Sequence, residues 1–388
     1  MVVIGGGSSG AFAAMRLNEA GVSTVIISQS SSCAFLSRGA VFANPMGLEL
    51  PDEFMEKFLE VFPNCRFRRD GFVTVNATHV DALCAPFSAA GLSLLPDMGV
   101  TLVSLPGILD TPVETTIASV LESHGKETMV TEVRLQSSIE EFYLSQVQWA
   151  RKLDNPKSRD DLFKRIDFQL QGKESHGFIF PPILGIEAHR ECVQRLSREL
   201  DSPVYELLGV PGWPTGIRIG CDLEKAIARS GIEIMRDRVL SVEKIRGGDL
   251  DTVATETGRN IAGRLFILAT GGICGGGIIF DKNLREPILD LPLFVNGRKA
   301  SVLSSAAAAP AESFWSENFM QNDAIMSAGV HVDKEGRPLN EYDGPVSKNL
   351  RACGSIIAST GSGQGSPLDL GMSALSGWEL AGKLIKTL

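Results

Sequence analysis

The amino-acid sequence predicts an α/β protein whose central sheet is parallel. The chain begins with an apolar strand at residues 2–4, passes through the glycine-rich loop 5–10 and enters a helix that ends near Glu19. A second apolar strand follows at 23–27, so the chain opens with a β-α-β unit. Neither strand alternates apolar and polar residues, which is typical of strands buried on both faces of a parallel sheet.

Length and composition exclude several classes of protein. The 388 residues are enough for two to three domains at about 150 residues each. Apolar residues make up 44% and charged residues 21%, which excludes collagen-like, low-complexity and membrane-spanning chains. The net charge of −9 argues against a nucleic-acid partner, because phosphate binding needs a positive face. The 7 cysteines are scattered without a Cys-x-x-Cys pair, so we expect neither a disulfide framework nor a metal site.

The sequence also indicates a location. No apolar run approaches the roughly 18 residues of a membrane span, and the N-terminus lacks the charged and apolar regions of a signal peptide. We therefore expect a cytoplasmic protein that meets a membrane only through partners. A peripheral position on the cytoplasmic face of the membrane stays open.

The loop 5–10 reads Gly5-x-Gly7-x-x-Gly10, between a strand and a helix. In that context it predicts an FAD/NAD(P)-binding (Rossmann-like) domain, in which the helix N-terminus holds a pyrophosphate. Gly5 allows the turn, Gly7 lets the backbone approach the phosphates, and Gly10 lets the helix pack on the strand. We assign cofactor binding to Gly5, Gly7, Ser9 and Gly10.

One expected part of this motif differs. The second strand is followed by Ser28 rather than by the acid that usually binds a ribose hydroxyl. A serine hydroxyl can make the same hydrogen bond less strongly, so we assign Ser28 to the cofactor. NADP is not favoured, because no arginine follows the strand to pair with its 2′-phosphate.

Two further segments favour a flavin over a nicotinamide. The apolar strand 266–272 ends in Ala269-Thr270-Gly271-Gly272, a form that two-dinucleotide-binding flavoproteins place beside the cofactor. Near the C-terminus a strand at 350–357, a loop at 361–365 and a helix from about Gly371 resemble the segment that closes over the ribityl chain, where a helix N-terminus would stabilise the reduced flavin. The cofactor residues assigned here are Thr270, Gly271, Gly272, Gly354, Ser355, Gly371 and Met372.

The domain organisation is predicted to be discontinuous. We assign residues 1–50, 211–280 and 330–388 to the flavin-binding domain. Residues 51–210 carry their own strands and helices, including a charged helical segment at 138–170, which predicts an inserted second α/β domain. Residues 281–329 are assigned to a connecting or cap segment, and the chain is expected to return to the first domain with a helix at 223–229.

Beyond this general pattern, the sequence resembles the family of the B subunit of anaerobic glycerol-3-phosphate dehydrogenase. The resemblance rests on Ser37-Arg38-Gly39-Ala40, Leu105–Thr111, residues 211–219 ending in Gly216-Ile217-Arg218, residues 269–277, and Arg285-Glu286-Pro287-Ile288-Leu289. These blocks are spread over most of the chain, while residues 51–98 match poorly.

The resemblance implies a flavin-dependent oxidoreductase component. Such a protein works with a catalytic flavoprotein, the A subunit, and an iron–sulfur, membrane-associated protein, the C subunit. The complex oxidises sn-glycerol 3-phosphate to dihydroxyacetone phosphate and passes electrons to quinone. The resemblance also places Ser37, Arg38 and Gly39 near the cofactor. The family is usually described as carrying FMN here, whereas the loop 5–10 predicts FAD; we expect FAD, with FMN as the alternative.

The candidate catalytic side chains follow from the chemistry of this oxidation. An anionic substrate needs a cation, and Arg218, Arg285 and Arg38 are candidates because the resemblance and an expected strand-end position put them near the cofactor. An alcohol needs a proton acceptor, and His189 or His331 could serve with an ordinary pKa of about 6.5. For each of these residues a structural role stays open.

Two other functions stay open at this point. One is a stand-alone FAD-dependent oxidase or dehydrogenase acting on another small hydroxy or amino substrate. The other is a non-catalytic scaffold protein that holds a flavin within a complex. The basic residues between Arg151 and Arg165 form either a solvated helical face or a docking surface for a partner.

Overall fold

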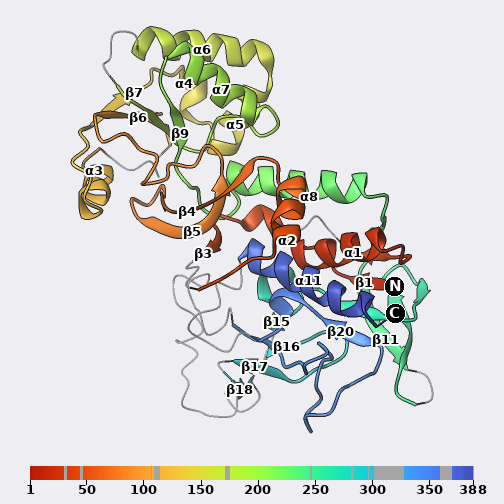
Figure 1. Ribbon diagram of the computed structural model, residues 1–388. Helices are drawn as coiled ribbons and strands as arrows, with labels where there is room; N and C mark the ends of the chain where they lie inside the picture. Colours follow the sequence, from red (N-terminus) through yellow and green to blue (C-terminus); the bar gives the residue numbers. More distant parts are fainter. Residues whose placement is uncertain are drawn as a thin grey trace. The chain divides into compact units, whose positions relative to one another are not determined.

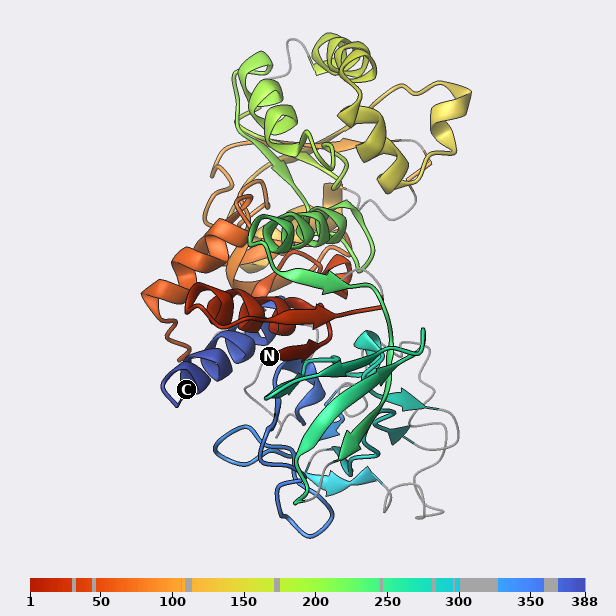
Figure 2. The same ribbon diagram turned by 90° about the vertical axis from the view of Figure 1, so that its right-hand side faces the viewer.

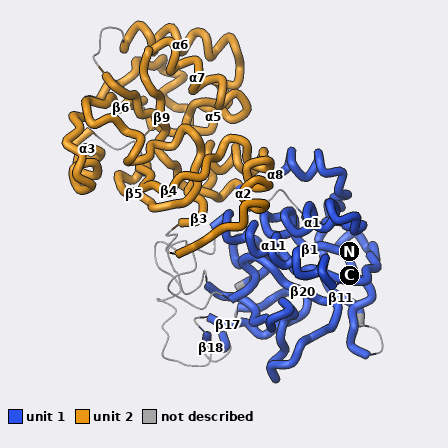
Figure 3. Tube along the Cα trace, viewed as in Figure 1, with its two compact units in different colours: residues 1–34, 223–388 blue, residues 35–222 orange. Residues whose placement is uncertain are grey.

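The computed structural model describes residues 1–29, 33–43, 47–105, 107–108, 114–170, 175–244, 247–280, 284–295, 297–300, 327–358 and 369–387. The chain divides into two compact units (Figure 3). Unit 1 consists of residues 1–34 and 223–388, and unit 2 of residues 35–222. The division into three parts expected from the sequence, with a connecting or cap segment at 281–329, stays a prediction.

Unit 1 is built on a five-stranded sheet with the order β10-β2-β1-β14-β20 (Figures 1 and 2). The strands are β10 (Glu233–Met235), β2 (Val25–Ile27), β1 (Val2–Ile4), β14 (Phe266–Leu268) and β20 (Leu350–Ala352). Every neighbouring pair is parallel, so all carboxyl ends lie at one edge of the sheet. This confirms the predicted parallel α/β fold, assembled from segments far apart in the sequence.

The five-stranded sheet shares an apolar core with small antiparallel sheets of unit 1. Val2 and Ile4 belong to an apolar core that includes residues of the antiparallel strands β11 (Val239–Lys244) and β12 (Leu250–Thr255). The same core includes residues of β17 (Leu293–Val295), the middle strand of a small sheet with β18 (Arg298–Lys299) and β19 (Gly329–Val330). The other antiparallel strands of unit 1 are β13 (Asn260–Ala262), β15 (Ile279–Phe280) and β16 (Leu284–Arg285).

Helices α1 (Ser8–Glu19) and α11 (Leu370–Ile385) lie side by side in unit 1 (Figures 1 and 2). A Cβ atom on Gly377 would lie 1.9 Å from the carbonyl oxygen of Ser9, so the two helix backbones are in direct contact. Elsewhere along this contact, the guanidinium of Arg16 lies over the Trp378 ring at 4.2 Å and donates to its carbonyl oxygen. The missing side chain at Gly377 therefore sets the distance between the helices.

Unit 2 contains a parallel sheet and an antiparallel one. The parallel sheet has the order β7-β6-β8-β9, and the antiparallel sheet has the order β3-β5-β4. The strands are β3 (Val41–Ala43), β4 (Cys65–Val73), β5 (His79–Pro86), β6 (Val100–Ser104), β7 (Val130–Arg134), β8 (Phe178–Phe180) and β9 (Val204–Glu206). The parallel sheet confirms a second α/β assembly, inserted in the sequence of the first.

Unit 2 contains helices before, within and after the charged segment at 138–170. They are α2 (Asp52–Val61), α3 (Glu114–Ser123), α4 (Ile139–Phe142), α5 (Gln146–Asp154), α6 (Pro156–Leu170) and α7 (His189–Glu199), with α8 (Pro214–Arg229) running past the boundary at 222. Capping boxes at Ser138 and Ser145 split the predicted 138–170 region into separate helices. The helix expected at 223–229 begins at Pro214 instead, because proline is well suited to a first helical turn.

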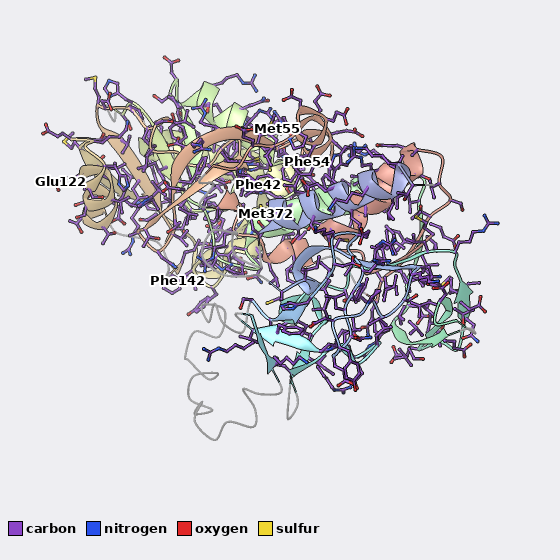
Figure 4. All side chains as sticks on the ribbon, turned by 60° about the horizontal axis from the view of Figure 1, so that its bottom comes forward. Phe42, Phe54, Met55, Glu122, Phe142 and Met372 are labelled. Atoms are coloured by element: carbon purple, nitrogen blue, oxygen red, sulfur yellow. The ribbon has the colours of Figure 1, made fainter. Side chains whose placement is uncertain are left out.

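Three phenylalanine rings pack around an unusual backbone position in unit 2. Phe42 has a φ of 57°, a left-handed conformation that bulky residues rarely adopt. Its ring lies 6.0 Å from Phe54 and 5.9 Å from Phe58, measured between ring centroids, and Figure 4 labels Phe42 and Phe54. All three side chains are buried, so apolar packing stabilises the strained conformation.

A buried ion pair joins β9 to α8. Arg218 donates to both carboxylate oxygens of Glu206, over 2.6 and 3.1 Å, and its Nε donates to the carbonyl oxygen of Gly185 over 2.6 Å. The backbone N–H of Leu184 donates to the same carboxylate. Burial alone raises the pKa of Glu206, but Arg218, His189 and these hydrogen bonds together hold that pKa below its ordinary value.

His189 completes this network. Its Nδ1 lies 3.0 Å from the carbonyl oxygen of Leu184, which only accepts, so Nδ1 carries the hydrogen. Its Nε2 lies 2.9 Å from the Ser88 hydroxyl and accepts from it. Burial and the nearby Arg218 lower the pKa of His189 to about 4, so the ring is neutral at neutral pH.

We predict that Gly377→Ala destabilises the protein, because its new methyl group would meet the Ser9 backbone. Overpacking of this kind costs about 1–3 kcal/mol. The matched control is Gly220→Ala, inside α8, whose methyl group would lie 3.5 Å from the nearest atoms, an ordinary contact distance. Urea unfolding measures both variants, and equal stabilities would contradict the role of Gly377.

We predict that His189→Gln reduces the loss of stability on acidification. Because the folded-state pKa of His189 is below its ordinary value, its stabilising contribution is complete above about pH 6.5 and is lost as the pH falls towards 4. A pKa lowered from 6.5 to about 4 corresponds to about 3 kcal/mol of stability between these limits. Urea unfolding at pH 7, 5.5 and 4.5 measures it, with His176→Gln, at an exposed histidine, as the control. Equal acid sensitivity of the His189 variant and the unmodified protein would contradict this account.

Candidate functional site

The predicted cofactor residues of unit 1 converge at the carboxyl edge of the five-stranded sheet. Gly5 follows β1, Ser28 follows β2, Thr270–Gly272 follow β14, and Gly354–Ser355 follow β20. In open α/β sheets this edge is where ligands bind, at the point where the strand order reverses. The order β2-β1-β14 places that reversal between β1 and β14, directly beside the glycine-rich loop.

The glycines of the loop 5–10 lie where a side chain would collide with backbone. Gly5 has a φ of 114°, and a Cβ atom there would lie 2.2 Å from the carbonyl oxygen of Ala269. A Cβ atom on Gly10 would lie 2.1 Å from the carbonyl oxygen of Gly5 and 3.2 Å from the Val3 side chain. These contacts bring the first turn of α1 against β1 and β14.

The N-terminus of α1 is available to an anion. Gly7 is its N-cap residue and provides no side-chain hydrogen bond, and no acidic side chain lies in the first turn. A Cβ atom on Gly7 would meet nothing within 4 Å, so the space beside this helix end is open. Ser9 and Gly10 belong to the same first turn. The backbone geometry suits a pyrophosphate held by main-chain N–H groups and the helix dipole.

The turns after β14 and β20 are bonded to each other. The N–H of Gly272 donates to the Ser355 hydroxyl over 3.0 Å, and the N–H of Gly354 donates to the Ser376 hydroxyl over 2.9 Å. The Thr270 hydroxyl is buried and has no hydrogen-bond partner within the described part of the chain. A buried hydroxyl without a partner at the carboxyl edge fits a polar group of a bound cofactor.

The C-terminal segment differs in detail from the expectation. β20 ends at Ala352, and Gly354 and Ser355 lie in a short 3-10 helix, η5 (Gly354–Ile356), rather than in a strand that continues to 357. Gly354 has a φ of 78°, which turns the chain. The backbone N–H groups of Gly371 and Met372 donate to the Asp369 carboxylate, which caps α11. The loop 361–365 lies outside the described residues.

Three predicted cofactor residues belong to unit 2. Ser37 is buried and its hydroxyl accepts from the N–H of Gly39 over 3.2 Å, whereas Arg38 is exposed. Gly39 has a φ of 99°, and a Cβ atom there would lie 2.6 Å from the Thr215 side chain. This turn is therefore shaped by local packing with the start of α8.

The structure places Arg218 and His189 in the buried network of unit 2. Arg218 lies within α8 and not at a strand end, which corrects the expectation from the sequence. Its side chain is 4% exposed and His189 is 1% exposed, and both are bonded to protein groups. Their contacts account for a structural role, and a catalytic role for either residue stays a prediction.

The other two catalytic candidates belong to unit 1. Arg285 is exposed at the end of β16. His331 is partly buried and stacks on Phe294, with ring centroids 3.5 Å apart, and burial lowers its pKa. Glu286, beside Arg285, is fully buried, and its carboxylate accepts from the N–H groups of Ile288 and Leu289. Burial raises the pKa of Glu286.

Sequence reasoning missed the residues that support the site from a distance. Ser376 bonds the turn at Gly354, and Gly377 sets the contact between α11 and α1. Glycine inside a helix is unfavourable unless close packing requires it. The position of Gly377 within the C-terminal helix was therefore the signal that could have identified it.

No helix among the described residues is long and apolar enough to cross a membrane. No group of three or more His, Cys, Asp or Glu side chains among them could hold a metal ion.

Two solved structures align with almost all of this chain at low sequence identity and low TM-score. A 3-ketosteroid delta1-dehydrogenase from Sterolibacterium denitrificans is 11% identical with a TM-score of 0.42, covering 100% of this chain and 99% of that one. An iminodiacetate oxidase from Chelativorans sp. BNC1 is 11% identical with a TM-score of 0.36, covering 99% and 95%.

Sequence comparisons are more specific. Residues 1–94 match the family model of the FAD binding domain, which confirms FAD as the predicted cofactor. Two curated proteins from Vibrio vulnificus, strains CMCP6 and YJ016, are 26% identical over 245 residues, and both are named as the B subunit of anaerobic glycerol-3-phosphate dehydrogenase. The matches cover 60% of this chain and 52% of each relative, so the chain spans about half their length. The chain is thus an FAD-binding flavoprotein distantly related to the B subunit of anaerobic glycerol-3-phosphate dehydrogenase.

Proposed function

We propose that this chain is the FAD-bearing component of a dehydrogenase complex that oxidises sn-glycerol 3-phosphate to dihydroxyacetone phosphate and passes the electrons towards quinone. The observation that carries the proposal is the convergence of the loop 5–10 with the turns at 270–272 and 354–355 on one sheet edge. The names of the Vibrio relatives support the substrate and the association with other proteins of a complex. The proposed partners are a catalytic flavoprotein, the A subunit, and an iron–sulfur protein, the C subunit. A cytoplasmic position with peripheral membrane contact through them is part of the same proposal.

The residues of unit 1 would hold FAD at this edge. The N–H groups at the start of α1 would bind the pyrophosphate, since Gly7 leaves space there and no side chain caps the helix. Ser28 would bond a ribose hydroxyl, and the unpartnered Thr270 hydroxyl would bond a polar atom of the cofactor. When bound, the flavin supplies a hydride acceptor.

The substrate phosphate needs a cation on the protein surface. Arg285 is exposed to solvent. Arg218 is buried, and its donors are directed at Glu206 and Gly185. Moving Arg218 to a substrate would leave the buried carboxylate of Glu206 without its counter-ion, which is costly. We therefore assign substrate binding to Arg285 ahead of Arg218.

A scaffold role is the second candidate, and one observation favours it. Two of the five candidate catalytic side chains, Arg218 and His189, are buried and bonded to protein groups. Of the other three, Arg38 and Arg285 are exposed and His331 is partly buried. Such a scaffold chain would bind FAD as a structural element and would hold the complex together without contacting the substrate.

We predict that the purified chain carries FAD and that Gly7→Ala weakens FAD binding by at least about tenfold, or about 1.4 kcal/mol. The methyl group would enter the space proposed for the pyrophosphate without touching the protein. Gly99→Ala is the control, because its methyl group meets only Met129, at 3.6 Å. Absorbance spectra, titration of the apoprotein, and mass spectrometry of the released cofactor measure the result. A colourless chain that takes up no added FAD, release of FMN, or unchanged affinity in the Gly7 variant would contradict the proposal.

We predict that Arg285→Ala raises the KM of the assembled complex for glycerol 3-phosphate by about tenfold or more, because a charged hydrogen bond is lost. Flavin content should stay unchanged. The control is Arg298→Ala, at another exposed arginine of unit 1. Dye reduction by the chain co-expressed with its partner proteins measures the effect. An unchanged KM would favour the scaffold role, and equal activity of the chain without partners would favour a stand-alone enzyme.

A further inference from the structure

Two histidines far apart in the sequence meet on the surface of unit 2. His79 is the first residue of β5, and His124 follows α3; both elements appear in Figure 1. Their Nε2 atoms lie 3.3 Å apart, and the ring centroids are 4.2 Å apart with an angle of 75° between the rings. His124 is exposed, and the His79 side chain is 37% exposed. Solvent and ions therefore reach this pair.

The hydrogen bond on the far side of His124 sets its tautomer. Its Nδ1 lies 2.8 Å from the carbonyl oxygen of Val120, in the last turns of α3. A carbonyl oxygen only accepts, so Nδ1 carries the hydrogen and Nε2 of the neutral ring presents a lone pair towards His79. Metal-binding histidines are usually held in this way, with the other ring nitrogen donating to a carbonyl or carboxylate.

The separation of the two Nε2 atoms suits a shared metal ion. Two nitrogen ligands at about 2.0–2.1 Å from zinc in a tetrahedral arrangement lie about 3.4 Å from each other. The separation in the structure is 3.3 Å. The ring centroids are 4.2 Å apart and would have to separate to about 5 Å for both lone pairs to point at one tetrahedral ion, so binding would require the two exposed rings to tilt apart.

A carboxylate adds negative charge beside the pair. Asp81 Oδ1 lies 4.0 Å from His79 Nε2, and the Asp81 side chain is 62% exposed. His79 and Asp81 are two positions apart in β5, so they lie on the same face of the strand. The carboxylate would favour a dication at the histidines without being one of its ligands.

We propose that His79 and His124 form a binding site for a divalent transition-metal ion such as zinc or copper, with water completing the coordination. Imidazole is a preferred ligand of both metals. The sequence did not indicate this site because the ligands are 45 residues apart. The proposal rests on unit 2 alone and does not depend on the flavin.

A bound ion would connect two elements of unit 2. It would link the start of β5 to the end of α3, and a ligand that binds only the folded state stabilises that state. The effect would be greatest on the segment between the two histidines, which contains β5, β6 and α3.

The test uses the full chain after treatment with a chelator. Isothermal titration with zinc chloride should show one ion bound, and Cu²⁺ should give an electron paramagnetic resonance spectrum with two nitrogen ligands. His79→Ala and His124→Ala should each weaken binding by more than the roughly tenfold expected for losing an outer partner. His176→Ala, at an exposed histidine of the same unit, should leave binding unchanged.

Three results would overturn the proposal. They are no binding by the unmodified chain, equal binding by the His79 and His124 variants, and a copper spectrum with one nitrogen ligand. The first would mean that the two rings share only an N–H···N hydrogen bond. Because the histidines are on the surface, unfolding of the variants is not expected, and circular dichroism checks it. The FAD content of each variant is measured as well, so that a loss of metal binding is distinguished from a loss of FAD binding.

Discussion

The close approach of backbone segments around the first turn of α1 is the constraint on which unit 1 depends. At Gly5, Gly10 and Gly377 the backbone of a neighbouring segment occupies the place of a side chain. With these three positions free of Cβ atoms, α1 rests on β1 and β14 while α11 rests on α1. The open end of α1 is consequently held at the sheet edge, where the turns at Thr270 and Gly354 also arrive. The cofactor site of unit 1 therefore requires glycine at these three positions as well as the polar side chains that line it.

Unit 2 depends on a different interaction. Glu206, at the end of β9, is surrounded by donors from α8 and from the segment before α7. A buried charge without a partner is costly, so once Glu206 is inside, Arg218 is required there. Arg218 and His189, which were candidates for catalysis in the sequence, are therefore found in the interior. Among the remaining candidates, exposure to solvent decides which receives a catalytic assignment.

The sequence was sufficient for features that are local. The strand, glycine loop and helix at residues 2–19 form one continuous pattern, and the apolar strand before Thr270 is equally clear. It was insufficient where distant contacts decide. The helix expected at 223–229 begins at Pro214, and a Cβ atom on Gly216 within it would lie 2.0 Å from the Phe35 carbonyl oxygen, so the helix needs that glycine. The run from Leu350 to Ile357 has the composition of a strand, but the turn at Gly354 ends it early.

The order in which the two units occur along the chain has a consequence for synthesis on the ribosome. Unit 2 is continuous from residue 35 to 222, whereas β1, α1 and β2 must wait for β14 and β20 from the later part of unit 1. Residues 223–388 take roughly ten to thirty seconds to translate at about 5–20 residues per second. During that time unit 2 is free to fold, while the apolar strands at residues 2–4 and 25–27 have no sheet to join. Until then the apolar residues of β1 and β2 lack the neighbouring strands that cover them in the folded protein.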